Sequence, residues 1–345
     1  MIKPNNLLIV RTDRIGDVVL SLPLAELIKK HYPDCRITFL LKDYTKSLVE
    51  GHPFIDNILI LKEKNNKISL IENILQIKKN SYDAAVVVYP TFITALIIFL
   101  SRIHSRIGTG YRWYSALFNN KVYEHRKNAL RHELEYNVNL LKYFGIEESV
   151  NPSTINFNLK IAKKDDERVT TILKVKNIDL KKPVIIIHPG SGGSSIDLPL
   201  NKFKELVDLI HNNLTAEILI TGSKSEIEYC HNLVVSGKTK NLAGLFNLGE
   251  LKSLINHCDI FIANSTGPLH IAAALGKNVI GFYPKIPQCS AKRWGPYSNK
   301  SIVFTPELEC FNCTREQCEH LDCMNSITVS KIFAEIEKIY KFVNK

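Results

Sequence analysis

The sequence predicts an α/β protein built from two doubly wound domains, each with a parallel sheet. Short apolar runs, typical of strands buried on both faces, alternate with segments whose apolar residues recur at helical spacing. Polar loops that contain glycine follow several of these runs, as in the first unit of a doubly wound sheet. The chain has 345 residues, which is long for one core and indicates about two domains.

The N-terminal domain is expected over residues 1–165. It opens with a buried strand at residues 7–10, a polar turn at 11–17 and a helix at 18–30. A later helix ends at Gly145, a residue that suits a helix C-terminus. The other expected strands are residues 36–41, 57–61, 82–89 and part of 103–110, and the other helices are 67–80, 92–102 and 134–144.

The C-terminal domain is expected over residues 180–327, after a lysine-rich junction at residues 151–182. The expected strands are residues 183–188, 216–221, 259–263 and 277–284, and the expected helices are 203–212, 248–256 and 269–275. An amphipathic helix in residues 328–345, which Thr328 is suited to cap, is expected to be able to pack back across the junction.

Charge and hydropathy point to a protein with an anionic partner. The net charge is +11, and residues 102–131 carry seven basic side chains against the single acid Glu124, with aromatic residues between them. Such a region suits phosphorylated lipid headgroups, a membrane surface or nucleic acid, and the alternative is a solvated basic face. Because the basic residues match no nucleic-acid module, nucleic acid is not expected. No export signal and no transmembrane helix are expected, since Pro90 interrupts the most apolar run, residues 84–100.

Four cysteines near the end of the chain form a cluster, Cys310, Cys313, Cys318 and Cys323. In a reducing compartment disulfides are not expected. The spacing suits a tetrahedral thiolate site for a structural zinc ion, and less well an iron–sulfur cluster. The alternative is a set of reduced structural cysteines, because the two four-residue gaps match no standard zinc module.

Two loops of the C-terminal domain are suited to bind a diphosphate. Residues 189–195 are rich in glycine and serine, and residues 265–268 precede a helix of small residues. Their backbone N–H groups and the helix dipole attract phosphate without a metal ion. Neither a P-loop nor a G-x-G-x-x-G fingerprint is present, so a nucleotide sugar fits better than an NTP or a dinucleotide.

The first polar loop places Arg11, Asp13, Arg14 and Asp17 after the first strand, where ligands of such sheets collect. Asp17 is suited to deprotonate an acceptor hydroxyl. The alternatives are turn or cap residues for the two acids, and surface ion pairs for the two arginines.

Three motifs in order, at residues 9–23, 188–192 and 264–276, together resemble the ADP-heptose:lipopolysaccharide heptosyltransferases of glycosyltransferase family 9. The resemblance covers nearly the whole chain, and the cysteine cluster resembles a tail found in many members. It implies a GT-B fold, in which two Rossmann-like domains with parallel sheets face each other across a central cleft. It also implies inverting transfer that needs no metal ion or other cofactor.

The same resemblance implies a cytoplasmic enzyme, peripheral to the cytoplasmic face of the inner membrane. Its donor would be a nucleotide-diphosphate sugar, ADP-heptose as first choice, and its acceptor a phosphorylated glycolipid of the lipopolysaccharide core. In this chain Ile196 and Ser265 stand where these enzymes commonly have Lys and Asp. Both positions concern donor binding, so a non-heptose donor is one alternative. Another is a non-catalytic basic binding protein with a four-cysteine metal site.

Carried over position by position, the resemblance makes Asp17 the general base of the reaction. The residues that it implies at the donor, with Lys224 as a rival to Glu226 for the ribose, are Arg11, Ser191, Gly192, Lys224, Glu226, Ser265, Thr266, Gly267 and His270. The expected acceptor-binding residues are Asp13, Arg14, Arg106 and Arg112.

Overall fold

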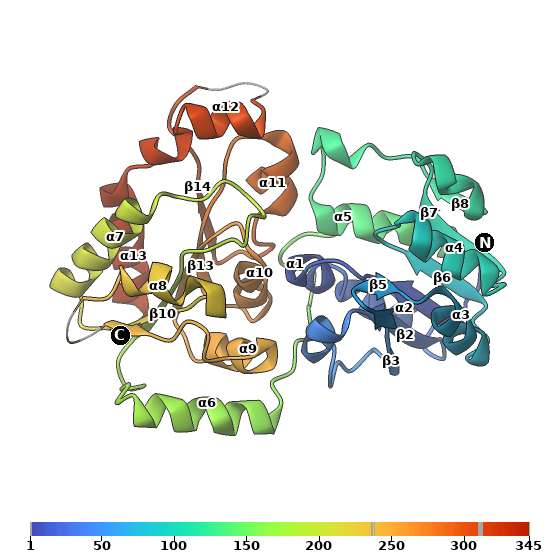
Figure 1. Cartoon of the computed structure of the whole chain (residues 1–345), viewed down its shortest axis with the longest axis horizontal. Helices are drawn as coiled ribbons and strands as arrows, with labels where there is room; N and C mark the ends of the chain where they lie inside the picture. Colours follow the sequence, from blue (N-terminus) through green and yellow to red (C-terminus); the bar gives the residue numbers. More distant parts are fainter. Residues whose placement is uncertain (1, 236, 238, 310–312, 345) are drawn as a thin grey trace. The chain divides into compact units, whose positions relative to one another are not determined.

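The chain forms two compact units, Met1–Lys160 and Ile161–Lys345, in a computed structural model that describes residues 2–235, 237, 239–309 and 313–344 (Figure 1). The division falls inside the lysine-rich segment 151–182. Each unit has its own six-stranded sheet.

The sheet of the first unit is parallel throughout, with the strand order β3-β2-β1-β6-β7-β8. Its central strand β1 is apolar and almost fully buried, because helices cover both faces of such a sheet. The chain leaves β1 on one side and returns as β6 on the other, which creates a switch point between these two strands. The bounds are β1 (Asn6–Val10), β2 (Arg36–Leu41), β3 (Asn57–Ile60), β6 (Ala84–Val87), β7 (Ser105–Thr109) and β8 (Asn120–Val122).

The helices of the first unit differ from the expectation at two places. The helix expected at residues 18–30 is divided into α1 and α2, because Pro23 has no N–H to continue the ladder and begins α2. The helix expected at residues 67–80 starts later, since Asn65 and Asn66 have positive φ and make a hairpin of β4 (Glu63–Lys64) and β5 (Lys67–Ile68). The bounds are α1 (Ile15–Val19), α2 (Pro23–His31), α3 (Leu70–Lys79), α4 (Phe92–Leu100) and α5 (Glu133–Val138).

Helices α3 and α4 lie beside each other on one face of this sheet (Figure 1). Their inward side chains, among them Ile77, Ala95 and Ile98, pack with Leu8 and Val87 of the central strands. The 3-10 helix η4 (Asn139–Phe144) continues α5 and ends at Gly145, whose φ of 77° is left-handed, as expected for that glycine.

The sheet of the second unit repeats the topology, with the strand order β11-β10-β9-β12-β13-β14 and parallel pairing throughout. Its switch point lies between β9 and β12. The bounds are β9 (Val184–His188), β10 (Glu217–Ile220), β11 (Thr239–Asn241), β12 (Ile260–Asn264), β13 (Asn278–Phe282) and β14 (Ser301–Phe304).

The helices at the two ends of the second unit both pack within it. The first, α6, contacts α9: the imidazole Nε2 of His257 is 2.8 Å from Asp166 Oδ1. The last, α13, packs against α7 (Figure 1), with Ile332 and Ile336 in the same core as Phe203. The face of this helix that is buried, which was expected to be able to pack back across the junction, packs on α7 inside this unit. The bounds are α6 (Lys163–Val175), α7 (Leu200–Asn213), α8 (Ile227–His231), α9 (Leu248–Asn256), α10 (Gly267–Ala274), α11 (Ala291–Trp294), α12 (Arg315–His320) and α13 (Val329–Val343).

Among the described residues, no helix combines the length and the apolar composition that crossing a bilayer requires.

Candidate functional site

A buried arginine organises the polar loop that follows β1. The Arg11 side chain is fully buried; its Nε donates to Asp13 Oδ1 at 2.8 Å, and its Nη2 donates to Asp17 Oδ1. Its Nη1 lies 3.8 Å from Glu133 Oε1. Burial alone would lower the pKa of this guanidinium, but the three carboxylates together raise it. Arg11 therefore stays charged and fixes Asp17 at the start of α1.

Asp13 and Asp17 are only partly buried, so they are accessible at the carboxyl edge of the sheet. Burial raises the pKa of Asp13 to about 7; Arg11 opposes this rise, and the charge of Asp17 adds to it. The half-exposed rings of Tyr44 and Tyr89 border the pair: the Tyr44 hydroxyl donates to the Asp13 carbonyl oxygen at 2.5 Å, and the Arg11 guanidinium lies 5.9 Å from the Tyr89 centroid.

Helix α5 supplies a second layer that the sequence analysis missed. Glu133 accepts from Arg126 Nη1 at 2.5 Å, and Asn137 accepts from the same nitrogen at 3.0 Å. The Asn137 amide also donates to the Leu20 carbonyl at 3.1 Å, which connects α5 to the end of α1. The available signal was the i, i+4 spacing of Glu133 and Asn137, which places both on one helix face.

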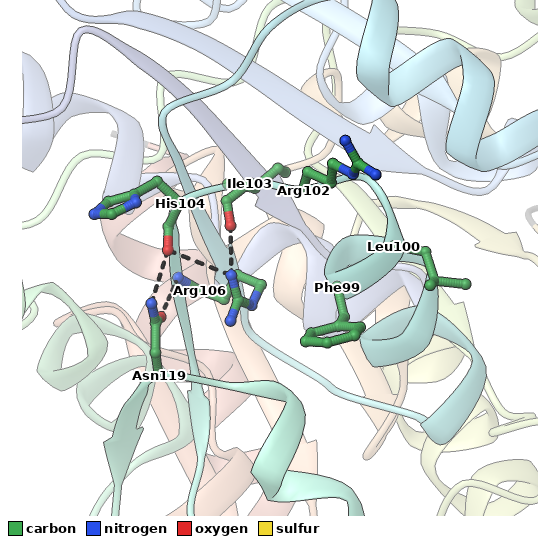
Figure 2. A pocket seen from close by; sticks show the side chains of 7 residues that line it. All are labelled: Phe99, Leu100, Arg102, Ile103, His104, Arg106 and Asn119. Carbon is green, nitrogen blue, oxygen red and sulfur yellow. Dashed lines mark hydrogen bonds between the residues drawn. The ribbon is translucent and has the colours of Figure 1, made fainter.

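The expected acceptor residues separate into two groups. Arg14 precedes α1 and Arg112 follows β7, which places both residues at the carboxyl edge of the sheet. Both are exposed. Arg106 instead lies near the amino end of β7, where it pairs with Ala85. Its guanidinium donates to the carbonyl oxygens of residues 103 and 104, at 2.6 and 3.3 Å (Figure 2), and to that of residue 117 at 2.9 Å. The structure therefore does not bring Arg106 to Asp17, and we remove it from the acceptor site.

In the second unit, the two glycine-containing loops are joined at the switch point. Asn264, the last residue of β12, donates to the Pro189 carbonyl at 2.6 Å and accepts from the Leu198 N–H at 2.8 Å. The Ser194 hydroxyl is within hydrogen-bond distance, 2.7 Å, of the Ser265 carbonyl. The loops after β9 and β12 therefore form one surface, as two loops that bind one ligand must.

The backbone of both loops suits an anion. Gly192 and Gly193 have φ of +58° and +73°, left-handed values that glycine adopts readily, and they lie in a turn whose backbone N–H groups can face an anion. Helix α10 begins at Gly267, and its N-cap Thr266 makes no side-chain cap hydrogen bond within the described part of the chain. The free N–H groups and the positive dipole end of α10 are thus available to a phosphate. His270 is buried in α10, one turn further on.

Glu226 approaches the first of these loops. Its Oε2 accepts from the Ser223 N–H and hydroxyl, both at 2.7 Å, while a Cβ on Gly190 would overlap its Oε1. Glu226 is thus placed beside the loop, whereas Lys224 is exposed. Burial lowers the pKa of the neighbouring His188 to about 4, which Glu226 partly opposes, so this imidazole is neutral.

The cysteine-bearing tail also contacts the donor loop. Arg315 of α12 donates to the carbonyl oxygens of Gly193 and Ser195 at 3.3 and 3.1 Å. Sequence reasoning missed this arginine because nothing local marks it. Cys318 and Cys323 are buried in a small apolar cluster against which Cys313 packs. Cys310 lies outside the described residues, and among those that are described no three His, Cys, Asp or Glu side chains are grouped to hold a metal ion. The three described thiols do not by themselves fit a metal site.

Comparison with known proteins identifies the family of this chain. Residues 72–323 match the family described as Glycosyltransferase family 9 (heptosyltransferase). A putative glycosyltransferase of Haemophilus influenzae is 27% identical over 314 residues, which cover 87% of this chain and 89% of the relative. Lipopolysaccharide heptosyltransferase 3 of Escherichia coli is 24% identical over 335 residues, covering 94% and 96%.

The solved structure of E. coli ADP-heptose lps heptosyltransferase II superposes with a TM-score of 0.79 at 19% identity, covering 99% of this chain and all of that one. This likeness concerns the fold, which is GT-B. The family match covers more than half of the chain. Because it is a match to a family of glycosyltransferases, it argues against the alternative of a non-catalytic binding protein. The chain belongs to glycosyltransferase family 9 and is a heptosyltransferase-like glycosyltransferase of lipopolysaccharide biosynthesis.

Proposed function

We propose that this enzyme transfers a heptose from ADP-heptose to a phosphorylated glycolipid of the lipopolysaccharide core, with inversion and without a metal ion. The observation that carries the proposal is Asp17, partly exposed at the edge of its sheet and held in place by the buried Arg11. A carboxylate so placed is suited to accept a proton from an acceptor hydroxyl.

The donor side of the proposal rests on the joined loops of the second unit. Ser191, Gly192, Thr266 and Gly267 would bind the diphosphate, with Ser265 and His270 beside them, and Glu226 would bind the ribose. Two N–H-rich loops and a helix dipole supply the charge stabilisation that other transferases obtain from a divalent cation. The likeness to E. coli ADP-heptose lps heptosyltransferase II supports ADP-heptose as donor.

The bond changes follow from these two sites. The acceptor oxygen forms a bond to the anomeric carbon as the bond from that carbon to the diphosphate oxygen breaks. The acceptor proton moves to Asp17, and ADP leaves with its added charge on the donor loops. Arg11, expected at the donor phosphates, is better assigned as a positioning residue for Asp17, because its guanidinium is buried among carboxylates. Asp13, Arg14 and Arg112 would contact the acceptor.

The test combines Asp17→Asn with a panel of nucleotides. ADP and ADP-heptose should raise the melting temperature of the wild type and of Asp17→Asn alike, because the donor loops are untouched. Transfer to a delipidated core acceptor should fall roughly 10²- to 10⁴-fold in the variant. Asp34→Asn changes an exposed aspartate in the same way and should keep full activity.

Each failure has its own meaning. Unchanged transfer by Asp17→Asn would reject Asp17 as the base. Stabilisation by UDP, GDP or CDP sugars alone would favour the second candidate, a family 9 transferase with a non-heptose donor, which Ser265 and Ile196 in place of the usual Asp and Lys favour. Loss of activity with EDTA, restored by a divalent cation, would contradict metal-independent transfer.

A further inference from the structure

Helix α4 exposes an apolar stripe to solvent. Its inward residues, including Ala95 and Ile98, pack on the sheet. At 100° per residue, its outward positions fall within a stripe about 120° wide on the opposite side. These positions are Phe92, Ile93, Leu96, Phe99 and Leu100, of which all but the half-buried Leu96 are exposed. A surface helix normally carries polar residues on that side, so the stripe indicates a contact with an apolar partner.

Aromatic side chains extend the stripe at the N-terminal end of the helix. The Trp113 ring lies 4.7 Å from the Phe92 ring and is 78% exposed. Tyr111 is exposed on the same loop. Tryptophan and tyrosine have an apolar ring and a polar group, and both are enriched at membrane–water interfaces.

The sequence around the stripe is basic and lacks acids. Residues 84–123 contain no Asp or Glu, but carry Arg102, Arg106, Arg112 and Lys121. In the part of the chain that the structure describes, neither Arg102 nor Arg112 takes part in an ion pair. Their charges are therefore available to an anionic partner.

A cavity of about 500 Å³ lies at the C-terminal end of α4 (Figure 2). Phe99 and Leu100 line it from the helix, Arg102 and His104 from the loop that follows, and Arg106 from the start of β7. The Arg106 guanidinium lies 5.3 Å from the Phe99 centroid and is fixed by backbone carbonyls. The apolar stripe is suited to contact the acyl chains of a bilayer. The cavity at its end, which two arginines line, is suited to contact the phosphate of a lipid headgroup.

We infer that α4 and the loops around Arg102 and Trp113, together termed the α4 surface, dock this enzyme on an anionic lipid bilayer. The inference rests on the proposed function and names the surface that the lipid-linked acceptor requires. The apolar stripe enters the headgroup–acyl boundary, and the cavity holds a lipid phosphate. Burial of the apolar stripe and attraction of the basic side chains to anionic lipids both strengthen binding, as they do for interfacial helices.

The placement of α4 connects this surface to the catalytic edge. Its first residue, Phe92, lies shortly after Tyr89, whose ring contacts the Arg11 guanidinium. Helix α4 spans roughly 13 Å at 1.5 Å per residue, and its N-terminal end follows the carboxyl edge of the sheet. The N-terminal, aromatic end of the α4 surface is therefore the end on the side of Asp17, whereas the cavity lies at the other end of the helix.

The test measures cosedimentation of the full chain with vesicles. The wild type should bind vesicles of phosphatidylglycerol and phosphatidylethanolamine, and bind phosphatidylcholine alone much more weakly. Phe99→Glu should lower the partition coefficient on the anionic vesicles about tenfold or more, because it places a charge in the apolar stripe. Arg102→Gln should lower it roughly fivefold. Phe342→Glu, which changes a 79% exposed phenylalanine of α13 in the same way, should bind like the wild type.

The outcomes separate the docking surface from the chemistry. Retained stabilisation by ADP in every variant shows that the donor unit is intact, so lost vesicle binding then supports the inference. Binding by Phe99→Glu equal to the wild type, or equal binding to both vesicle types, overturns it and leaves a protein partner for the stripe. Loss of ADP stabilisation in the wild type would instead reject the proposed donor site.

Discussion

At the scale of single residues, the charge of one buried arginine explains much of the polar loop that follows β1. Arg11 contacts Asp13, Asp17 and Glu133, so three acids compete for one guanidinium at this point. Arg126 supplies a second positive charge to Glu133. The site tolerates this excess of acid because burial and the neighbouring Asp17 raise the pKa of Asp13 to about 7.

This pKa gives a prediction for stability against pH. Because the pKa of Asp13 is raised above its unfolded value near 4, the native state binds more protons than the unfolded state between about pH 4 and 7. The wild type should thus lose stability as pH rises through this window, by at most about 4 kcal/mol from this group. Asp13→Asn lacks the group, so its free energy of unfolding should rise relative to the wild type as pH increases.

Urea unfolding of both proteins from pH 4.5 to 8 measures this difference. A difference that is flat with pH would show that Asp13 ionises normally in the folded protein. Asp34→Asn, at an exposed site, is the control and should give no trend.

At the scale of elements, both sheets build their sites in the same way, by loops that meet where the strand order reverses. In the second unit the side chain of Asn264 joins these loops, and Arg315 holds one of them from α12. The cysteine-bearing tail thus holds the loop after β9 through the hydrogen bonds of Arg315, whether or not its thiols bind a metal ion. The four-cysteine metal site stays a prediction, because Cys310 lies outside the described residues.

The close approach of Glu226 to the first donor loop gives a prediction for Gly190. In Gly190→Ala the added methyl group would overlap Glu226 Oε1 and displace the carboxylate from the proposed ribose position. The affinity for ADP should fall by about tenfold or more, the worth of a charged hydrogen bond. Isothermal titration with ADP measures this.

Gly276→Ala is the matched control for that experiment. Gly276 ends α10 with φ of +71° and open space around its Cβ position, so the substitution strains the backbone without touching the loops. It should lower stability and leave ADP affinity unchanged. Equal affinity of Gly190→Ala and the wild type for ADP would remove Glu226 from the donor site.

At the scale of the whole molecule, the proposed roles divide between the two units: the first carries Asp17 and the α4 surface, and the second carries the loops proposed to bind the donor. If the α4 surface serves only to dock the enzyme, its variants should lose activity on a lipid-linked acceptor and keep activity on a soluble one. Phe99→Glu should lower kcat/KM about tenfold or more for a lipid-linked acceptor in anionic vesicles. For a delipidated acceptor in solution, kcat/KM should equal that of the wild type.

Steady-state transfer assays with the two acceptors measure this ratio, with Phe342→Glu as the reference variant. An equal loss on both acceptors would mean that Phe99 supports the catalytic unit rather than docking. If Phe99→Glu were as active as the wild type on both acceptors, docking would not limit transfer.

The sequence by itself determined the class of fold and most central strands. Residues 7–10, 183–188 and 259–263 are apolar runs that only burial on both faces explains, and β1, β9 and β12 lie there. The short edge strands β8, β11 and β14 were not predicted. In β8 and β11 polar or mixed residues such as Thr239 and Asn241 give no periodic signal, and β14 is mostly apolar but only four residues long. The loop motifs likewise marked the polar loop with Asp17 and the two glycine-containing loops, since glycine and helix-start chemistry are local; their roles stay predictions.

Tertiary structure alone decided which side chains meet. Arg11 and Glu133 are distant in sequence, and only the packing of α5 brings them together. Arg106 looked like a ligand because it is basic and lies in a basic region, but its position at the amino end of β7 separates it from the catalytic edge. The stripe on α4 was apolar in the sequence, yet only its exposure in the fold distinguishes a docking surface from core. Local patterns determine elements, whereas contacts between distant elements depend on how those elements pack.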